Sequence, residues 1–277
     1  MRSLLIRAFL APLLLPPVLL AQTYPWLPGG SHPESIQRRI PAPPGYLRTP
    51  VEPGSFGEWL RNLPLKPTSA PVVLFDGTPK RRQDVHQAVI DIDTGTRDLQ
   101  QCADAVMRLR AEFLFASGRS SEIVFSFTNG SRAAFQKWSE GYRPSVSGNV
   151  VRWTRVAAPD SSHPALRSYL DKVFQYAGSY SLSRELQQAA SGSLQPGDVF
   201  IHGGFPGHAV IVVDAAVDSE SGKKVFLLAQ SYMPAQNIHV LKNLDPKEPG
   251  PWYSVKHSGD LVTPEWIFDW KDLKRFP

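Results

Sequence analysis

The sequence predicts an α+β fold in which helices come first and an antiparallel sheet follows. Apolar residues repeat at helical spacing over 99–113. Short apolar runs separated by Gly- and Ser-containing turns then occupy 198–242, a pattern typical of antiparallel strands. Hydrophobic residues make up 42% of the chain and charged residues 20%, so the chain can bury a substantial core and a disordered protein is excluded.

The amino terminus is typical of a secretory signal. Arg2 and Arg7 flank the start of an apolar run over 8–21 that contains no acidic residue. Prolines interrupt the run, and it is shorter than the roughly 20 apolar residues that a membrane-spanning helix needs. We therefore expect a signal peptide over 1–21, cleaved after Ala21, and a periplasmic or secreted mature chain with no stable membrane span.

The charge of the chain gives little support to a nucleic-acid partner. The sequence has 30 Lys+Arg, 25 Asp+Glu and a formal net charge of +5, which falls to +3 when Arg2 and Arg7 leave with the signal. The basic residues are scattered and form no arm or stripe. We expect no nucleic-acid role, and the oligomeric state stays open.

Residues 22–54 are rich in proline and glycine, which excludes a regular helix or a central strand there. We expect an extended lead-in that wraps the domain, because apolar side chains are available to dock it on the surface. Those side chains are Trp26, Leu27, Ile40, Tyr46 and Leu47.

Short elements are expected between this lead-in and the main helix. Residues 55–60 predict a capped helix, which Pro64 ends. Apolar runs at 72–75 and 88–92 predict strands, the first closed by a turn at residues 76–77.

The main helix is expected to begin near residue 98. Asp98 is a good amino-terminal cap, and Gln101 lies three residues later, at the spacing of a capping box. Cys102 belongs to the apolar repeat that follows, so we expect it in the first turn, on the apolar face of the helix.

The later elements follow from the same kinds of pattern. Residues 122–127 predict a strand, and residues 129–130 a turn. Helices are expected at 131–139, 164–176 and 181–190, and strands at 198–202, 208–214, 224–231 and 237–242.

Cys102 is the only cysteine of the chain. A single thiol cannot form an internal disulfide, and in an oxidising compartment an idle thiol is liable to oxidation and mispairing. Two interpretations stay open. Cys102 is either a nucleophile that reacts as a thiolate or a core residue, because free cysteine is among the most buried residue types.

Two stretches, LQPGDVFI at 194–201 and GHAVIVV at 207–213, resemble the paired strands of NlpC-like cell-wall cysteine peptidases, members of the papain-like superfamily. In that family the nucleophilic cysteine opens a helix, a histidine starts a later strand, and a polar residue on the next strand orients the histidine. The resemblance implies Cys102 as the nucleophile, His208 as the base and Gln230 as the third residue.

The same resemblance implies a fold. It is a single papain-like α+β domain over 55–277, in which an amino-terminal catalytic-type helix packs on an antiparallel sheet. The stretch between the cysteine and the histidine is longer than usual in that family, which implies a helical insertion around 118–190. Cys102 is followed by Ala103 and Asp104, where that family usually has Ser-Gly.

The chain as a whole also resembles an exported bacterial family catalogued as domain of unknown function 4846. The stretches SFGEWLRNLPLK at 55–66, CAD at 102–104 and QSYMPAQ at 230–236 carry this resemblance. It implies export and no particular activity.

The chemistry of a Cys-His pair can also be argued from the residues themselves. The amino end of a helix and an adjacent imidazolium together lower the pKa of a thiol from about 8.5 toward neutrality. Backbone N–H groups there, with the amide of Gln100 or Gln101, are candidates for binding an oxyanion. The Gln230 amide is a candidate partner for one imidazole nitrogen, which leaves the other to face the sulfur.

Alternatives stay open for the histidine and for the third residue. His208 lies on the same strand face as Val210 and Val212, so a buried structural histidine is the competing interpretation. Ser231, Gln236 and Asp214 compete with Gln230 for the orienting role.

A metal site and a sugar-binding wall are less favoured. His202 and His208 with Asp198 or Asp214 match no defined zinc spacing, so we expect no metal and no cofactor. Four late aromatic residues suit a sugar-binding wall, but core packing is the favoured interpretation. They are Trp252, Tyr253, Trp266 and Trp270.

Two functions follow from these observations. The first is a hydrolase, a peptidase or amidase that acts on a peptide or peptidoglycan amide through a Cys-His thioester mechanism. The second is a non-catalytic cell-envelope protein that uses the same fold to bind peptide or glycan, with Cys102 inert in the core.

Overall fold

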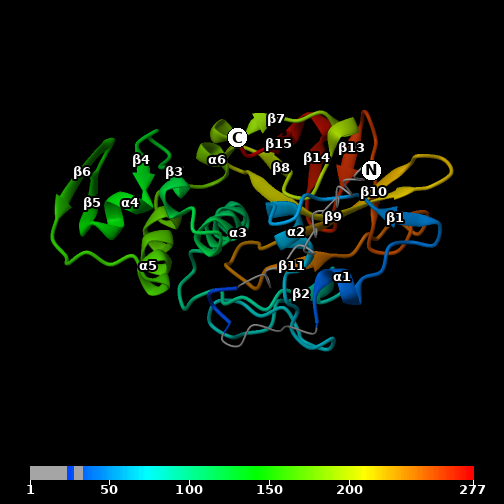
Figure 1. Cartoon of the computed structure of the whole chain (residues 1–277), viewed down its shortest axis with the longest axis horizontal. Coiled ribbons are helices and arrows are strands. Elements are labelled where there is room, and N and C mark those ends of the chain that lie inside the picture. The colour runs from blue at the N-terminus through cyan, green and yellow to red at the C-terminus, as the bar shows by residue number, and fades with distance from the viewer. Residues whose placement is uncertain (1–23, 28–33) are drawn as a thin grey trace, which may run out of the picture.

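The computed structural model describes residues 24–27 and 34–277 (Figure 1). The expected signal peptide, with its cleavage after Ala21, lies outside these described residues. The described chain mixes helices with antiparallel strands, so the prediction of an α+β fold is confirmed. Within the described residues no helix is long and apolar enough to cross a membrane.

The centre of the molecule is an antiparallel sheet. Its β9 and β10 are the longest strands and are almost wholly buried, because both faces of the sheet are covered. The strand order is β2 (His86–Val89), β11 (His239–Leu241), β10 (Lys224–Gln230), β9 (His208–Asp218), β8 (Val199–His202), β15 (Leu273–Arg275) and β7 (Gln187–Gln188), while β1 (Tyr46–Arg48) pairs with β9 and β12 (Tyr253–Ser254) with β10.

Alternate residues of β9 enter two different hydrophobic clusters, as the period of a strand requires. Ile211 and Val213 join the main core, which also contains apolar residues of the helices. Val210 and Val212 join a smaller aromatic cluster on the other face of the sheet. That second cluster is closed by the short hairpin β13 (Asp260–Val262) and β14 (Ile267–Asp269) and by the 3₁₀ turn η3 (Trp270–Asp272).

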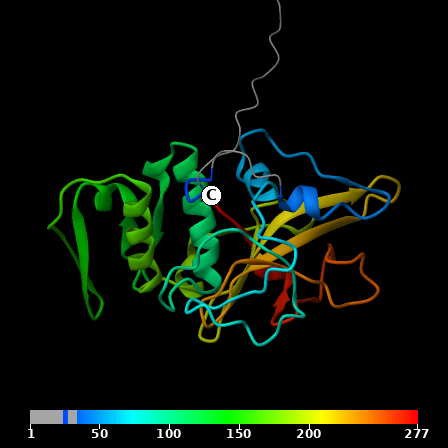
Figure 2. The same cartoon turned by 90° about the horizontal axis from the view of Figure 1, so that it is seen from below.

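The long helix α3 (Cys102–Ala116) lies between the sheet and a second lobe in both views (Figures 1 and 2). It packs against β9 and against the short helix α2 (Phe56–Arg61), whose expected cap is confirmed because Ser55 Oγ accepts from the Glu58 N–H at 3.2 Å. The first N–H groups of a helix have no partner within the helix, and a capping side chain such as that of Ser55 supplies one.

The start of α3 differs from the prediction. Gln101, not Asp98, is the N-cap, and the Asp104 carboxylate accepts from the Gln101 N–H at 3.1 Å. Asp98 instead accepts from the Ala235 N–H at 2.7 Å, a contact with a distant loop that outweighs its local capping preference. Cys102 is therefore the first residue of the helix.

The second lobe is more mixed than the helical insertion that we expected around 118–190. The prediction of a helix over 131–139 is wrong at residues 132–134, which form a strand paired with residues 124–126. A second hairpin, in which residues 142–147 pair with residues 150–155, was not expected. The elements are η1 (Ser120–Glu122), β3 (Val124–Ser126), β4 (Arg132–Ala134), α4 (Phe135–Ser139), β5 (Tyr142–Ser147), β6 (Val150–Arg155), α5 (His163–Phe174), α6 (Ser179–Glu185) and η2 (Ser191–Ser193).

The lead-in also differs in part from the expected extended segment. One helical turn, α1 (Ile36–Arg39), lies within it, and β1 pairs with the second half of β9. Ile40 is buried and Trp26 packs edge-on against Trp59, so both dock as expected, whereas Leu47 is 66% exposed and does not.

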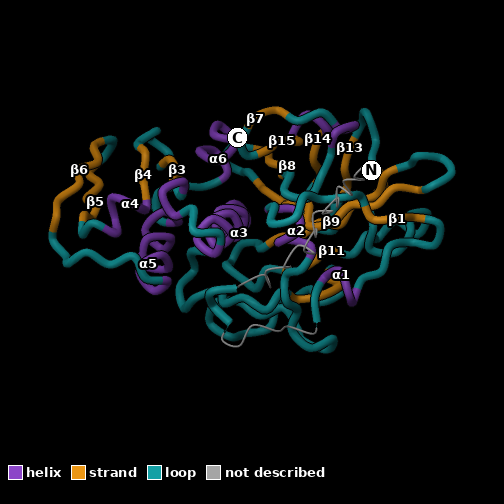
Figure 3. Tube along the Cα trace, in the orientation of Figure 1, coloured by secondary structure: helices purple, strands orange, loops and turns teal. Residues whose placement is uncertain are grey.

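Loops occupy most of the chain between α2 and α3, as Figure 3 shows. The strand expected at 72–75 is absent; Val73 and Leu74 form only isolated bridges, to Pro79 and Gln236. The strand expected at 88–92 forms as β2, shifted toward the amino terminus.

A buried ion-pair cluster fixes the lead-in and α2 on the sheet. Asp214, in β9, has no solvent exposure. Its carboxylate accepts from Arg48 Nε of β1 at 2.7 Å and from Arg61 Nε of α2 at 2.6 Å. A buried carboxylate without such partners would be strongly unfavourable, so these elements must dock together.

We predict that Asp214→Ala lowers the free energy of unfolding by about 3–5 kcal/mol, because it leaves two guanidinium groups unpaired. Glu220→Ala is the control: this carboxylate is exposed on the turn after β9, and its loss is expected to change stability by less than about 0.5 kcal/mol. Urea unfolding of the three proteins measures both values. Equal stabilities of the two variants would contradict the assigned role of the cluster.

Candidate functional site

The three residues expected to act together lie where three elements meet. Cys102 is the first residue of α3, His208 the first of β9 and Gln230 the last of β10. Because β9 and β10 are antiparallel neighbours, the start of one lies beside the end of the other. His208 Nε2 and Gln230 Oε1 are 2.9 Å apart, within hydrogen-bond distance.

The Cys102 thiol lies against the first peptide of β9. The backbone N–H of Ala209 faces the sulfur and, with the N–H groups at the start of α3, favours the thiolate. Burial opposes this and Asp104 adds to the opposition, so that together they raise the pKa of Cys102 to about 11. The expected lowering of the thiol pKa toward neutrality is therefore not found in this state of the molecule.

Asp104 explains part of that outcome. It lies two residues into the helix, is 6% exposed, and burial holds the pKa of its carboxyl well above the usual range. One carboxyl oxygen accepts from the Gln101 N–H and the other is buried without a hydrogen-bond partner among the described residues. Because like charges repel, the Asp104 carboxylate disfavours a thiolate at the neighbouring Cys102.

The His208 ring is enclosed by aromatic side chains. It is 2% exposed and meets Tyr232 edge-on at 4.9 Å and Phe268 in a stacked arrangement at 5.8 Å between ring centroids, with Trp266 at 5.4 Å. Burial and, to a smaller extent, the Lys80 charge lower the pKa of His208 to about 4, although the hydrogen bond with Gln230 favours the charged ring. The ring is neutral at pH 7, so both members of the pair are uncharged.

The second ring nitrogen, Nδ1, takes part in no hydrogen bond within residues 24–27 and 34–277, and none joins it to the Cys102 sulfur. The ring of Tyr232 meets that of His208 edge-on, and burial, Glu265 and, to a smaller extent, Cys102 raise the pKa of Tyr232. Catalytic hydrogen bonds are often long before substrate binds, so this geometry is compatible with a Cys-His pair.

Further polar residues extend from Gln230. Its Nε2 donates to Glu265 Oε2 at 2.7 Å, and Lys80 Nζ donates to Glu265 Oε1 at 2.7 Å. His239 Nε2 lies 3.5 Å from the same Gln230 nitrogen. Sequence analysis missed Lys80, Glu265 and His239, since each comes from a different segment and no local motif marks them.

The two glutamines proposed for an oxyanion site are differently placed. Gln100 is buried, and its amide bonds to Arg108 and to the Asp93 carbonyl in the core, so it offers no free donor near the thiol. Gln101 Nε2 donates to Asp98 at 3.0 Å in a more exposed position. The backbone N–H groups at the start of α3 are therefore the better oxyanion donors.

The competitors for the orienting role make other contacts. The Ser231 hydroxyl oxygen lies 2.8 Å from the Gln236 carbonyl oxygen and 3.0 Å from that of Gln100, and Gln236 Oε1 is buried without a partner among the described residues. Asp214 belongs to the ion-pair cluster with Arg48 and Arg61. Of these candidates, Gln230 is the one that bonds to His208.

Most of the alternative metal ligands have other partners. Asp198 pairs with Arg275 and Asp214 with Arg48 and Arg61, while His202 lies 3.7 Å from Asp272. Within the part of the chain that the structure describes, no group of three or more His, Cys, Asp or Glu side chains is arranged to hold a metal ion.

The four late aromatic residues divide between core and site. Trp252, Tyr253 and Trp270 are buried in the hydrophobic clusters, which agrees with the favoured interpretation of core packing. Trp266 is half-buried and lies beside both His208 and His202, so it is the one that borders the candidate site.

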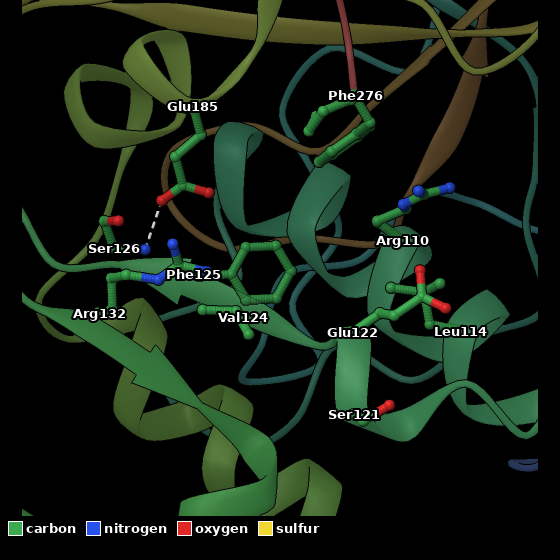
Figure 4. Close-up of a pocket in the computed structure, with 11 residues that line it drawn as sticks. Arg110, Leu114, Ser121, Glu122, Val124, Phe125, Ser126, Arg132, Glu185 and Phe276 are labelled. Carbon is green, nitrogen blue, oxygen red and sulfur yellow. Dashed lines mark hydrogen bonds between the residues drawn. The ribbon is translucent and has the colours of Figure 1, made fainter.

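A cavity of about 440 Å³ lies elsewhere, and no member of the Cys-His pair lines it. Figure 4 shows Arg110 and Glu122 across the cavity from Arg132 and Glu185. Ser126 N–H donates to Glu185, whose pKa is raised by burial. The cavity holds charges of both signs and no nucleophilic thiol, so we assign no reaction to it.

The turn before His208 is tightly packed. A Cβ atom at Gly207 would lie 2.3 Å from Ser179 Oγ and 2.6 Å from the Gly204 carbonyl oxygen, too close without a shift of the backbone. Only glycine therefore allows the turn to pass under α6 and place the histidine at the start of β9.

Comparison with known proteins gives one match. The sequence profile of a family described as "Domain of unknown function (4846)" matches residues 36–275. No curated protein and no solved structure matches the chain.

We predict that Gly207→Ala destabilises the protein by about 1–3 kcal/mol and shifts the His208 ring signals in an NMR spectrum, because the added methyl group overpacks the turn. Gly192→Ala is the matched control: its new Cβ would meet nothing within 4 Å, so stability and spectrum should be almost unchanged. A Gly207→Ala protein as stable as the control would show that the close approach is not limiting.

Proposed function

We propose that this chain, which belongs to the family of domain of unknown function 4846, is an exported cysteine hydrolase that cleaves a peptide or peptidoglycan amide. In this proposal Cys102 is the nucleophile, His208 the general base and Gln230 the orienting residue. The observation that carries it is the hydrogen bond from His208 Nε2 to Gln230 Oε1, on a strand whose first peptide touches the thiol. That bond leaves Nδ1 unprotonated and available as a base.

The reaction needs four proton transfers, two as the thioester forms and two as it is hydrolysed. His208 Nδ1 takes the thiol proton as the Cys102 sulfur attacks the carbonyl carbon of the amide, and backbone N–H groups at the start of α3 donate to the oxyanion. The imidazolium then gives that proton to the leaving amine as the carbon–nitrogen bond breaks, leaving a thioester. Water, deprotonated by the same nitrogen, releases the acid and restores the thiol.

The resting pair is neutral, which decides how the thiol is activated. With a pKa of about 11, only about one Cys102 in ten thousand is a thiolate at pH 7 without help. His208, with its pKa lowered to about 4, is in its basic form over the whole neutral range. The mechanism is therefore removal of the proton during attack, and not a preformed thiolate–imidazolium pair.

The order of elements supports a papain-like architecture for this site. A helix that begins with the cysteine packs on an antiparallel sheet whose later strands begin with the histidine and end with the glutamine. The NlpC-like resemblance of 194–201 and 207–213 points to cell-wall amides as substrates. The expected signal peptide points to the periplasm or the exterior as the place of action.

The alternative is a non-catalytic cell-envelope protein that binds peptide or glycan, with Cys102 as packing. The raised thiol pKa and the lack of a described bond between the sulfur and His208 favour it. A buried structural thiol has these properties.

The pH dependence of Cys102 alkylation separates the two functions. In the wild type we expect a rate that is nearly flat from pH 5 to 8 and falls below about pH 4, where His208 takes up a proton. In His208→Ala the rate should drop at least about tenfold at pH 7 and then rise about tenfold per pH unit toward the thiol pKa. Mass spectrometry after timed iodoacetamide treatment measures the alkylation rate. Since the chain has one cysteine, the added mass reports on Cys102 alone.

The matched control for this experiment is His257→Ala, an exposed histidine that bonds to Ser191 and should leave the rate unchanged. If the alkylation rate rises with hydroxide concentration to the same extent in wild type and His208→Ala, Cys102 is a core residue that His208 does not activate. Labelling that appears only after denaturation would lead to the same conclusion and would exclude the hydrolase.

Turnover gives a second test. We expect the mature protein to release amine from peptidoglycan-derived peptides, and a thioester adduct on Cys102 that hydroxylamine removes. Cys102→Ala should abolish both, and His208→Ala should lower kcat by about 10²–10⁴-fold, the range for loss of a general base. Undiminished turnover by Cys102→Ala would rule out the thioester mechanism.

A further inference from the structure

We propose that Glu265, together with His239, fixes the direction of the Gln230 amide and so holds His208 with its proton on Nε2. This inference rests on the proposed function, since it concerns which nitrogen of His208 is free to act as the base. It assigns positioning roles to residues that neither the sequence patterns nor the family match identifies.

The Gln230 amide could in principle point either way. Its oxygen only accepts and its nitrogen only donates, so the neighbours on each side decide the direction. Glu265, whose carboxylate only accepts, lies 2.7 Å from the amide nitrogen. Lys80 holds the other carboxylate oxygen at 2.7 Å, and the two side chains are 9% and 11% exposed, so this ion pair is nearly buried and locally fixed.

His239 adds a second acceptor on the same side. It has no solvent exposure, and its Nδ1 lies 2.9 Å from the carbonyl oxygen of Asn237, which can only accept. The proton of His239 is therefore on Nδ1, and its Nε2 lone pair faces the Gln230 nitrogen at the longer distance of 3.5 Å. Burial lowers the pKa of His239 to about 3, so the ring stays a neutral acceptor.

The direction of the amide then sets the tautomer of His208. With both hydrogens of the Gln230 nitrogen aimed at Glu265 and His239, only the amide oxygen remains for His208 Nε2. That nitrogen must carry the proton in order to donate, and a neutral ring has only one. Nδ1 is left with its lone pair, as the base of the proposed reaction requires.

The test is the tautomer of His208, read by NMR of the mature protein labelled with ¹⁵N-histidine. The His208→Gln variant assigns the ring signals. We expect the wild type to show protonated Nε2 and unprotonated Nδ1 between pH 6 and 8. A protonated Nδ1 in the wild type would overturn the inference before any further variant is made.

Glu265→Gln is the informative substitution because it keeps the size of the side chain but adds a donor. The new amide can offer its oxygen to Lys80 and its nitrogen to Gln230, which favours the reversed Gln230 amide and moves the His208 proton to Nδ1. We expect the Nδ1–H form to appear in this variant. Gln230→Glu in the same background should restore the Nε2–H form, since a carboxylate at residue 230 can only accept.

Two controls exclude a general structural effect. Glu220→Gln, an exposed carboxylate, should leave the tautomer unchanged, and the signals of His163, held by Glu112, should stay in place in every variant if the fold is intact. An unchanged His208 tautomer in folded Glu265→Gln, or no restoration by Gln230→Glu, would overturn the inference.

The tautomer is measured without any activity, so the two proposals fail separately. If Cys102 is unreactive but His208 shows the expected tautomer and the expected response to Glu265→Gln, the hydrolase proposal is wrong. The positioning roles of Glu265 and His239 are then still supported. If both hold, Glu265→Gln should slow Cys102 alkylation at pH 7 by about 10–100-fold, the range for loss of an orienting partner, and Gln230→Glu should restore the rate.

Discussion

The buried carboxylate of Asp214 in β9 is the constraint on which the rest of the structure depends. An anion in the middle of a covered sheet requires partners, and Arg61 of α2 and Arg48 of β1 supply them. These contacts dock the lead-in and α2 on β9, and α3 packs beside them on the same strand. Since β9 begins at His208, the strand that they hold in place is also the one that presents the candidate base.

Burial then determines the chemistry available at the site. The aromatic enclosure of His208 and the partial burial of Cys102 limit contact with water, which shifts both pKa values toward the uncharged forms, to about 4 and about 11. The nearly buried ion pair of Lys80 with Glu265 lies beside Gln230. In such a site, activation of the thiol would depend on where protons and lone pairs point, because no ion pair of cysteine and histidine forms at rest.

The elements that sequence patterns predicted are those whose stability is local. The periodic helix α3, the capped helix α2 and the apolar strands β8 to β11 form near their expected positions. The failures have tertiary causes: Asp98 accepts from Ala235, 137 residues away, and so does not cap α3. Residues 132–134 pair with β3 instead of extending α4, and α1 forms in a segment where proline and glycine argued against any helix.

The sequence by itself determined that the one thiol lies in the first turn of the long helix, that His208 begins one strand and Gln230 lies near the end of the next, and that the chain is α+β. These conclusions rest on side-chain periodicity and on turn residues, which act over a few positions of the chain. Only the tertiary structure decided that Glu265 and His239 converge on Gln230, that Lys80 holds Glu265, and that Cys102 and His208 are both neutral at rest. Convergence and burial arise from contacts between residues far apart in the sequence. A local sequence pattern therefore cannot show how much solvation each polar side chain loses on folding.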